Sequence, residues 1–404
     1  MGRLDAEGEA PALAGVRVLD LGGALTAYAA RLLADLGADV LLAEPPGGDR
    51  LRRSPPFAAG VEGTDASLLF AYYRATQRGI TLAAGRPAAL DLLGQLGAMA
   101  DVVLVSPSRR QPLAGWDAEA GTLSWSRPDA VLAAITPFGL TGPMRDWRAT
   151  PMVSYAMSGL MHRVGAADGP PLAPPGRQAW DEAGAYAVLG ILAALWSRER
   201  VGGQVLDLSV HEVQSSKDWL VERYAVEGMD QWGRVAGVGY PPTGVYQCAD
   251  GPFDVAAHQL AHWDSFLTML GHPDELSEPS LTDPMVRREL FDVLHETIQQ
   301  LVSQRSRGEL VELGQRAGLP CAMLLSPAEF ARDEHIVARG TLVPTPTPGD
   351  GTVAMPGPAH RAVPEALVPR RAAPRLGEHN REVYVGELGH TEDELERWAG
   401  EGLV

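Results

Sequence analysis

Residues 15–49 read GVRVLDLGGALTAYAARLLADLGADVLLAEPPGGD, and this stretch decides the fold. The apolar run Val16–Leu21 predicts a short buried strand, and residues 26–37 have the apolar spacing of a helix that stops at Gly37. A second apolar run at Asp39–Ala43 leads into a turn rich in proline and glycine. Strands joined by a helix of this length run parallel, so the chain begins as an α/β domain.

The same alternation continues along the chain. Its pattern predicts a helix at residues 87–99, strands at 101–105 and 130–136, a long apolar helix at 181–200 and a strand at 204–210. We therefore expect a Rossmann-like large domain, with a parallel sheet between layers of helices.

The pattern changes near residue 240. Two strands at 243–247 and 253–257, followed by helices at 260–270, 287–304 and 306–317, indicate a smaller α+β domain. The proline-rich residues 343–375 are expected to be an extended connection, and residues 381–400 to be helical. The predicted division is 1–224 for the first part of the large domain, 225–340 for the small domain, and 341–404 for a linker and the C-terminal part of the large domain.

Composition excludes several classes of partner. The 404 residues carry 51 acidic and 34 basic side chains, a net charge of −17, so the chain is expected to bind neither nucleic acid nor an anionic membrane. No apolar run reaches the length of a membrane span, and the first residues are polar, so we expect a cytoplasmic protein.

Residue counts also exclude several chemistries. The only lysine is Lys217, which leaves no Walker A loop and little room for lysine catalysis. Cys248 and Cys321 are too few for a disulfide framework or a structural zinc site, and no Gly-x-Ser-x-Gly nucleophile elbow occurs. His258 and His262 have the spacing of two zinc ligands, but no third ligand accompanies them, so no metal is expected.

Two features near predicted helix starts have both a structural and a functional interpretation. Gly22 and Gly23 follow the first strand, and Glu44 lies where a ribose-binding acid would stand, but the remaining glycines of a dinucleotide fingerprint are missing. Asp181 and Glu182 open the long helix, where acids commonly stabilise a first turn. A carboxylate at a helix start can also be a nucleophile.

Strings spread over nearly the whole chain resemble the class III CoA-transferases, the group of formyl-CoA and carnitine-CoA transferases, to which the α-methylacyl-CoA racemases are related. They are GVRVLDL at 15–21, LADLGADV at 33–40, EPPGGD at 44–49, FGLTGP at 138–143, GILAAL at 190–195, GLPC at 318–321 and LGEHN at 376–380. Their order and spacing make the resemblance specific for the fold.

The resemblance implies an interlocked homodimer, with a large domain built from both chain ends. It also implies that CoA is a substrate and that no further cofactor is needed. An enzyme aspartate attacks an acyl-CoA thioester to give an anhydride, and the released thiolate then forms an aspartyl-CoA thioester. A small carboxylate acceptor reverses these steps, so one thioester is exchanged for another.

The positions that the family uses for chemistry match less well than the scaffold. The family's aspartate lies four residues before the glycine that is Gly184, which is Trp180 in this chain. Asp181 is one step later, about 100° around a helix, and is the expected catalytic residue. The family's Asn-Lys pair near CoA falls on Thr76 and Gln77. The racemase histidine and aspartate fall on Thr150 and Pro151, which speaks against racemase chemistry.

Other residues are candidates to replace what is missing from the expected site. Four arginines are candidates to hold CoA phosphates: Arg74, Arg78, Arg109 and Arg110. Gly237 and Gly239 fall in the region of the family's active-site glycine loop. The favoured hypothesis is a CoA-transferase that uses Asp181. The alternatives are a member repurposed for other acyl chemistry, a non-catalytic protein in which Trp180 fills the old site, or a purely structural dimer.

Overall fold

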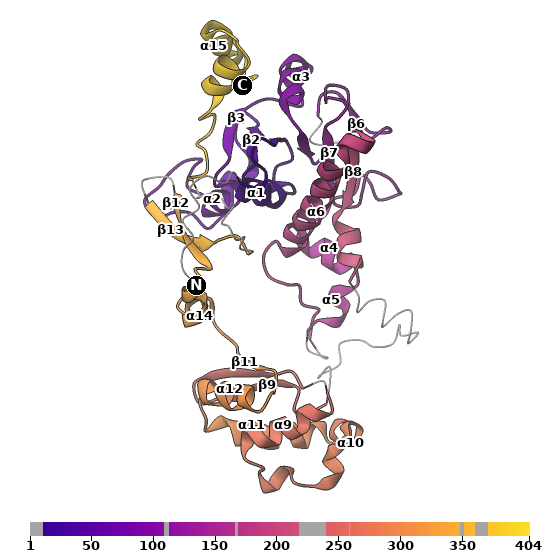
Figure 1. The fold of residues 1–404 in the computed structure, drawn as a ribbon, viewed down its shortest axis with the longest axis vertical. Helices are drawn as coiled ribbons and strands as arrows, with labels where there is room; N and C mark the ends of the chain where they lie inside the picture. The colour runs from indigo at the N-terminus through magenta and orange to yellow at the C-terminus, as the bar shows by residue number, and fades with distance from the viewer. Residues whose placement is uncertain are drawn as a thin grey trace. The chain divides into compact units, whose positions relative to one another are not determined.

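The computed structural model describes residues 11–108, 113–165, 169–217, 240–257, 259–347, 351–359 and 371–404. The chain forms two compact units (Figure 1). The large unit comprises residues 1–164, 171–231 and 340–404, and the small unit comprises residues 165–170 and 232–339.

A six-stranded sheet forms the centre of the large unit, with every neighbouring pair parallel. In spatial order its strands are β3 (Arg78–Thr81), β2 (Asp39–Glu44), β1 (Arg17–Asp20), β4 (Val102–Val105), β7 (Val131–Thr136) and β8 (Gln204–Ser209). The strand order reverses direction between β1 and β4. The predicted mixed α/β fold with a parallel sheet is confirmed.

The central strands are apolar because both of their faces are covered. All four residues of β4 and all six of β7 are buried, as expected for parallel strands between helical layers. On one face, Val18, Leu104 and Ile135 pack with α1 (Ala27–Asp35), α4 (Pro151–Met157), α6 (Gln178–Val201) and α7 (Val210–Ser215). The other face packs against α3 (Leu90–Met99) and C-terminal residues.

Helix α6 lies closely against α1, and Gly184 makes this approach possible. A Cβ atom at Gly184 would stand 2.9 Å from the backbone nitrogen of Ala29 and 3.0 Å from the Cβ atom of Tyr28. A larger residue would push the two helices apart. This contact fixes the start of α6 beside the loop that follows β1.

The C-terminal segment covers the edge of the sheet at β3. The side chain of Asn380 accepts from the backbone of Thr81 and donates to its hydroxyl, and Tyr384 donates to the Thr81 carbonyl. Residues Arg381–Glu387 form a π-helix, η6, followed by α15 (Glu392–Gly400). These contacts satisfy backbone groups that an uncovered edge strand would leave open.

The small unit has its own core around an antiparallel sheet in the order β11 (Cys321–Met323), β10 (Gly251–Val255), β9 (Gly244–Cys248). Its helices include α9 (Ala261–Leu270), α10 (Pro284–Glu289), α11 (Phe291–Ser303), α12 (Arg307–Arg316), α13 (Pro327–Phe330) and α14 (Glu334–Ala338). The remaining short elements within the described ranges are η1 (Arg50–Arg53), α2 (Leu68–Arg74), η2 (Pro87–Ala89), β5 (Trp116–Asp117), β6 (Thr122–Leu123), α5 (Leu160–Arg163), η4 (Asp274–Leu276) and η5 (Pro279–Thr282).

One expectation about local structure was wrong, and one strand was missed. The proline-rich stretch 343–375 is not simply an extended connection, because β12 (Leu342–Thr347) and β13 (Gly351–Pro356) pair as an antiparallel hairpin. Prolines are tolerated there because a two-stranded sheet has only edge strands. The sequence also gave no signal for β3, which is only four residues long. None of the helices within the described ranges is long and apolar enough to cross a membrane.

Candidate active site

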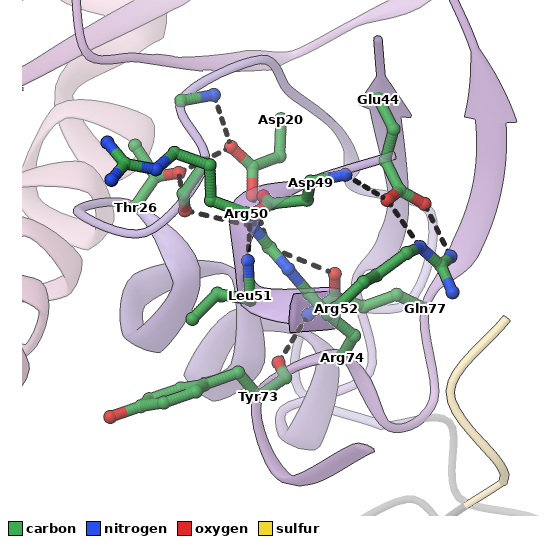
Figure 2. Close-up of polar contacts among 12 residues, drawn as sticks. Asp20, Thr26, Glu44, Asp49, Arg50, Leu51, Arg52, Tyr73, Arg74 and Gln77 are labelled. Atoms are coloured by element: carbon green, nitrogen blue, oxygen red, sulfur yellow. Dashed lines mark hydrogen bonds and ion pairs between the residues drawn. The ribbon is translucent and has the colours of Figure 1, made fainter. Parts of the chain in front are cut away.

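The loop after β1 lies at the carboxyl edge of the sheet and is held by Asp20. The Asp20 carboxylate accepts hydrogen bonds from the Gly22 backbone at 2.9 Å and from the Thr26 hydroxyl at 2.6 Å (Figure 2). A Cβ atom on Gly22 would lie 2.1 Å from the Thr26 side chain, so only glycine fits here. The loop is therefore tightly built, although it lacks the dinucleotide fingerprint.

Arg74 donates a hydrogen bond to the Gly23 carbonyl of this loop, and its burial leaves it inaccessible to a ligand. Its guanidinium is fully buried and lies 2.5 Å from the carboxylate of Asp20 and 3.5 Å from that of Asp49 (Figure 2). Burial opposes the charge, but the two carboxylates outweigh it and raise the pKa of Arg74. The prediction that Arg74 binds a CoA phosphate directly does not agree with this geometry, because its charge is already neutralised inside the protein.

Glu44 is also committed to a buried ion pair. Arg52 donates to both oxygens of the Glu44 carboxylate, at 2.6 and 2.7 Å, and the Asp49 backbone donates to one of them at 2.9 Å (Figure 2). Glu44 is 1% exposed. It therefore cannot hold a ribose at the surface, which removes the remaining support for a nicotinamide site.

A cavity of about 410 Å³ opens at the carboxyl edge of the sheet. It is lined by the loops that follow β1, β2, β3 and β4, together with Ala149 and Trp180. Because the strand order reverses beside β1, this is the place where open parallel sheets usually bind ligands. Two exposed arginines, Arg50 and Arg86, stand in its wall. Arg86 is held by the backbone carbonyls of Glu401 and Gly402, and Figure 2 shows the Arg50 guanidinium lying away from the buried network.

Trp180 and Asp181 point in different directions from the first turn of α6. Trp180 lines the cavity, and its buried indole nitrogen has no hydrogen-bond partner among the described residues. The carboxylate of Asp181 instead accepts a hydrogen bond from the Tyr73 hydroxyl of α2 at 2.7 Å. The one-residue shift thus places an aromatic side chain in the cavity wall and turns the acid toward Tyr73.

The environment of Asp181 favours its protonated form. Burial raises the pKa of this carboxyl, and the Tyr73 hydrogen bond and the charge of Arg177 oppose that rise only in part. Burial, together with the nearby Asp181 carboxylate, also raises the pKa of Tyr73, so the tyrosine remains a donor. A half-buried carboxylate with one neutral donor is less solvated than a surface acid and is a stronger nucleophile once ionised.

The neighbouring acid, Glu182, differs because its charge has a cationic partner. Lys217 lies 2.6 Å from the Glu182 carboxylate, and the Gln214 amide donates to the same oxygen at 2.9 Å. Among the described residues, the acidic pair therefore separates into a glutamate in an ion pair and an aspartate with no cation within hydrogen-bonding distance. Lys217, the single lysine of the sequence, is thus engaged in an ion pair with Glu182.

Arg177 precedes α6 and stacks on aromatic rings. Its guanidinium carbon lies 4.6 Å from the ring centre of Trp180 and 5.7 Å from that of Tyr73. Its guanidinium makes no hydrogen bond or close ion pair with any described residue, and burial lowers the pKa of Arg177, which the nearby charges of Asp181 and Asp49 oppose only in part. Sequence reasoning missed both Tyr73 and Arg177, and the only signal for Arg177 was its position four residues before Asp181.

The other predicted ligands of CoA phosphates are not gathered around this cavity. Arg78 begins β3 at the amino edge of the sheet, opposite the cavity, and pairs with Asp39, Glu382 and Glu387. The three carboxylate partners of Arg78 and its place at the amino end of β3 do not favour its predicted role as a CoA phosphate ligand. Arg109, Arg110, Gly237, Gly239 and His258 lie outside the described residues. Within the described part of the chain, no cluster of three or more His, Cys, Asp or Glu side chains is arranged to hold a metal.

Comparison with known proteins places this geometry in context. The sequence pattern of CoA-transferase family III matches residues 13–380. Formyl-CoA:oxalate CoA-transferase of Streptomyces coelicolor is 30% identical over 420 aligned positions, covering 98% of this chain and all of that protein. The beta subunit of succinyl-CoA–L-malate CoA-transferase from Chloroflexus aurantiacus is 30% identical and covers 95% of this chain and 96% of its own. A crystal structure of a CAIB/BAIF family protein from Brucella suis has a TM-score of 0.81 at 25% identity, over 94% of this chain and all of that one.

Proposed function

The chain belongs to CoA-transferase family III, and we propose that it moves CoA between an acyl-CoA donor and a small carboxylate acceptor with Asp181 as the nucleophile. Its relatives are named as enzymes that use formyl-CoA with oxalate or succinyl-CoA with malate, which supports the same reaction type here. The single observation that carries the role of Asp181 is its half-buried carboxylate, which accepts from Tyr73 beside the cavity residue Trp180.

The proposed reaction consists of two symmetrical halves. An ionised Asp181 oxygen attacks the thioester carbonyl, the carbon–sulfur bond breaks, and CoA leaves as a thiolate while an acyl-aspartyl anhydride forms. The thiolate attacks the aspartyl carbonyl, which releases the first carboxylate and leaves an aspartyl-CoA thioester. The acceptor carboxylate then attacks that thioester to give a second anhydride and the thiolate. The thiolate takes the new acyl group and restores Asp181.

The cavity at the carboxyl edge is the proposed CoA site, with CoA as a substrate and no resident cofactor. Arg50 and Arg86 bring two cationic side chains to its wall, and guanidinium groups bind phosphate oxygens well. Arg109 and Arg110 remain proposed phosphate ligands from the loop after β4. Gly237 and Gly239 remain the proposed active-site loop.

The alternatives are less well supported than catalysis. A non-catalytic member would need Trp180 to fill the whole site, yet the cavity persists with Trp180 in its wall. The named relatives are transferases, which also speaks against a purely structural dimer.

We also propose that two copies associate as the interlocked homodimer of the Rossmann-like family fold, in the cytoplasm. Helix α6 carries exposed apolar side chains at Tyr186, Leu189 and Trp196, with Trp196 87% exposed. This stripe repeats at helical spacing, and apolar patches of this kind commonly become buried in assemblies. Light scattering at micromolar protein should give twice the chain mass of 43.0 kDa, and a monomer would contradict the proposal.

The direct test of function compares two neighbouring acids. Asp181→Asn should reduce CoA exchange by roughly a thousandfold or more, because an amide cannot form the anhydride. The matched control is Glu182→Gln, which should stay within about threefold of the parent, since it removes only a partly exposed ion pair. Exchange is measured by chromatography of acyl-CoA products over a panel of donors and carboxylates.

Two results would contradict this assignment. Full activity in Asp181→Asn would exclude Asp181 as the nucleophile. A gain of transferase activity in Trp180→Asp, with none in the parent, would show that the parent has left transferase chemistry.

A further inference from the structure

Tyr73 is a buried tyrosine whose hydroxyl is directed at one particular oxygen of Asp181. Its side chain belongs to a residue that is 3% exposed, and its hydroxyl lies 2.7 Å from Oδ1 of that carboxylate. Figure 2 shows the Tyr73 ring pointing away from the buried network around Arg74, although the two residues are neighbours in α2. Arg74 is bound to the loop after β1, whereas Tyr73 is directed to the acid.

The ring of Tyr73 is confined by three neighbouring side chains. Tyr28 and Tyr72 meet it edge to face, with ring centres 6.4 and 5.0 Å away, and the Arg177 guanidinium carbon lies 5.7 Å from its centre. Tyr28 is itself fixed where α1 approaches α6 closely at Gly184. The hydroxyl therefore occupies a preorganised position, and a donor that is already in place needs no rearrangement during a reaction.

Tyr73 acts toward Asp181 as a hydrogen-bond donor. Burial, together with the charge of Asp181 and the hydrogen bond to it, raises the pKa of the Tyr73 hydroxyl above its ordinary value. The phenol thus keeps its proton at neutral pH. The proton that Tyr73 directs at Oδ1 is available whether this oxygen carries a charge or belongs to a carbonyl group.

The hydrogen bond makes the two oxygens of Asp181 unequal. Within the described part of the chain, Oδ1 receives the Tyr73 hydrogen bond and Oδ2 receives none. Oδ2 is therefore the better placed to attack a thioester, and it becomes the bridging oxygen of the anhydride. When the CoA thiolate attacks the aspartyl carbon, the bond to the bridging oxygen breaks. Oδ1 stays on the aspartyl carbon as the carbonyl oxygen of both the anhydride and the aspartyl-CoA thioester.

We propose that Tyr73 is a second catalytic residue, which stabilises the negative charge that forms on Oδ1 each time the aspartyl carbonyl is attacked. This role rests on the proposed function and adds an oxyanion donor to it. The attacking group is the CoA thiolate in one half of the reaction and the acceptor carboxylate in the other. In both attacks the carbonyl electron pair moves to Oδ1 and returns when the leaving group departs. Tyr73 donates its hydrogen bond throughout and transfers no proton.

The test measures the decay of a preformed enzyme–CoA thioester, because Asp181 cannot titrate in that state. The protein is loaded with succinyl-CoA or formyl-CoA, separated from free CoA, and mixed with the matching acid, succinate or formate. Loss of the CoA adduct is followed by intact-protein mass spectrometry after rapid quenching. Tyr73→Phe keeps the ring and should slow this decay by roughly 100-fold to 1,000-fold at every pH, the usual effect of removing one oxyanion donor.

The matched control removes another buried tyrosine hydroxyl. Tyr384 is 0% exposed, and its hydroxyl donates to the Thr81 carbonyl at 2.8 Å, far along the chain from Asp181 and without a printed contact to it. Tyr384→Phe should therefore lower the melting temperature at least as much as Tyr73→Phe, yet its CoA adduct should decay at the parent rate.

Three outcomes separate this role from its alternatives. Decay of the Tyr73→Phe adduct at the parent rate would overturn it, and Tyr73 would then act only on the pKa of Asp181, with the proposed function intact. Equal slowing in Tyr384→Phe would also overturn it, because the effect would follow stability. If the parent forms no CoA adduct with any acyl-CoA donor, the proposed function itself fails, and the role of Tyr73 fails with it.

Discussion

Two groups of charged residues lie at the same end of the sheet and differ in how far their charges are neutralised by neighbouring residues. Around Arg74, the cation is fully buried, and Asp20 and Asp49 lie within 2.5 and 3.5 Å of it. Around Asp181, the acid and Arg177 are half-buried, and the hydrogen bond that the carboxylate receives from the described residues comes from a neutral tyrosine. Charge is neutralised in the first group and left available in the second.

This difference distinguishes residues that maintain the local structure from residues that are proposed to react. A buried ion pair helps to fix the local structure, and removing one partner leaves the other charge buried without a counter-charge. A half-buried carboxylate with a raised pKa lowers stability at neutral pH and is typical of sites that bind or react. The Arg74 group shapes the loop after β1, and the Asp181 group performs the proposed reaction.

The largest expected effect is on stability, from Arg74→Gln. This change leaves Asp20 buried at 0% exposure without its cation, which should cost about 3–5 kcal/mol of unfolding free energy. Chemical denaturation followed by circular dichroism measures the loss. The control is Arg78→Gln, whose carboxylate partners are partly exposed, and for which about 1 kcal/mol is expected. Equal losses of unfolding free energy in the two variants would show that the ion pairs of Arg74 stabilise the fold no more than those of Arg78.

A smaller effect is expected on pH dependence, from Tyr73→Phe. The Tyr73 hydrogen bond lowers the pKa of Asp181, so its removal should raise that pKa further. Since only the ionised acid attacks, the acidic limb of the kcat/KM profile should move to higher pH. Activity well above the limb should reach a plateau below the parent value, because Oδ1 still lacks its donor. A limb that does not move would show that Asp181 does not control the rate.

The fold was more predictable than the site, and β4 shows why. Its four consecutive apolar residues predict a strand that is buried on both faces, and the apolar run of β7 predicts the same. Prediction failed for β3, whose Arg78-Gly79-Ile80-Thr81 sequence has one strongly apolar side chain. It also failed for the hairpin of β12 and β13, because its pairing compensates for prolines that normally argue against strands.

The site was less predictable because its residues meet only in space. Tyr73 is 108 positions from Asp181, and no periodic pattern links them. Arg74 and Arg78 look equivalent in sequence, but one lies under the carboxyl-edge loop and the other at the amino edge of β3. The acidic pair at 181 and 182 was visible, but only the contact of Glu182 with Lys217 distinguishes the two acids.

The smallest expected effect is the stability of Asp181→Asn. Burial raises the pKa of Asp181, so the folded protein is stabilised at low pH and loses that contribution as pH rises from the acid's ordinary value through the raised one. A neutral amide avoids this loss, and the variant should be about 0.5–1 kcal/mol more stable than the parent at pH 7. If Asp181 served only as a first-turn charge, the variant would instead be less stable by some 0.3–1 kcal/mol.

Trapping the covalent intermediate tests the central claim most directly. The protein is incubated with acyl-CoA donors, treated with borohydride or hydroxylamine, digested, and its peptides are sequenced by mass spectrometry. The account predicts a reduced or hydroxamate-modified carboxyl group at Asp181, absent from Asp181→Asn and unchanged in Glu182→Gln. Modification of another carboxylate, such as Asp49 or Glu182, or no modification of an enzyme that turns over CoA, would contradict it.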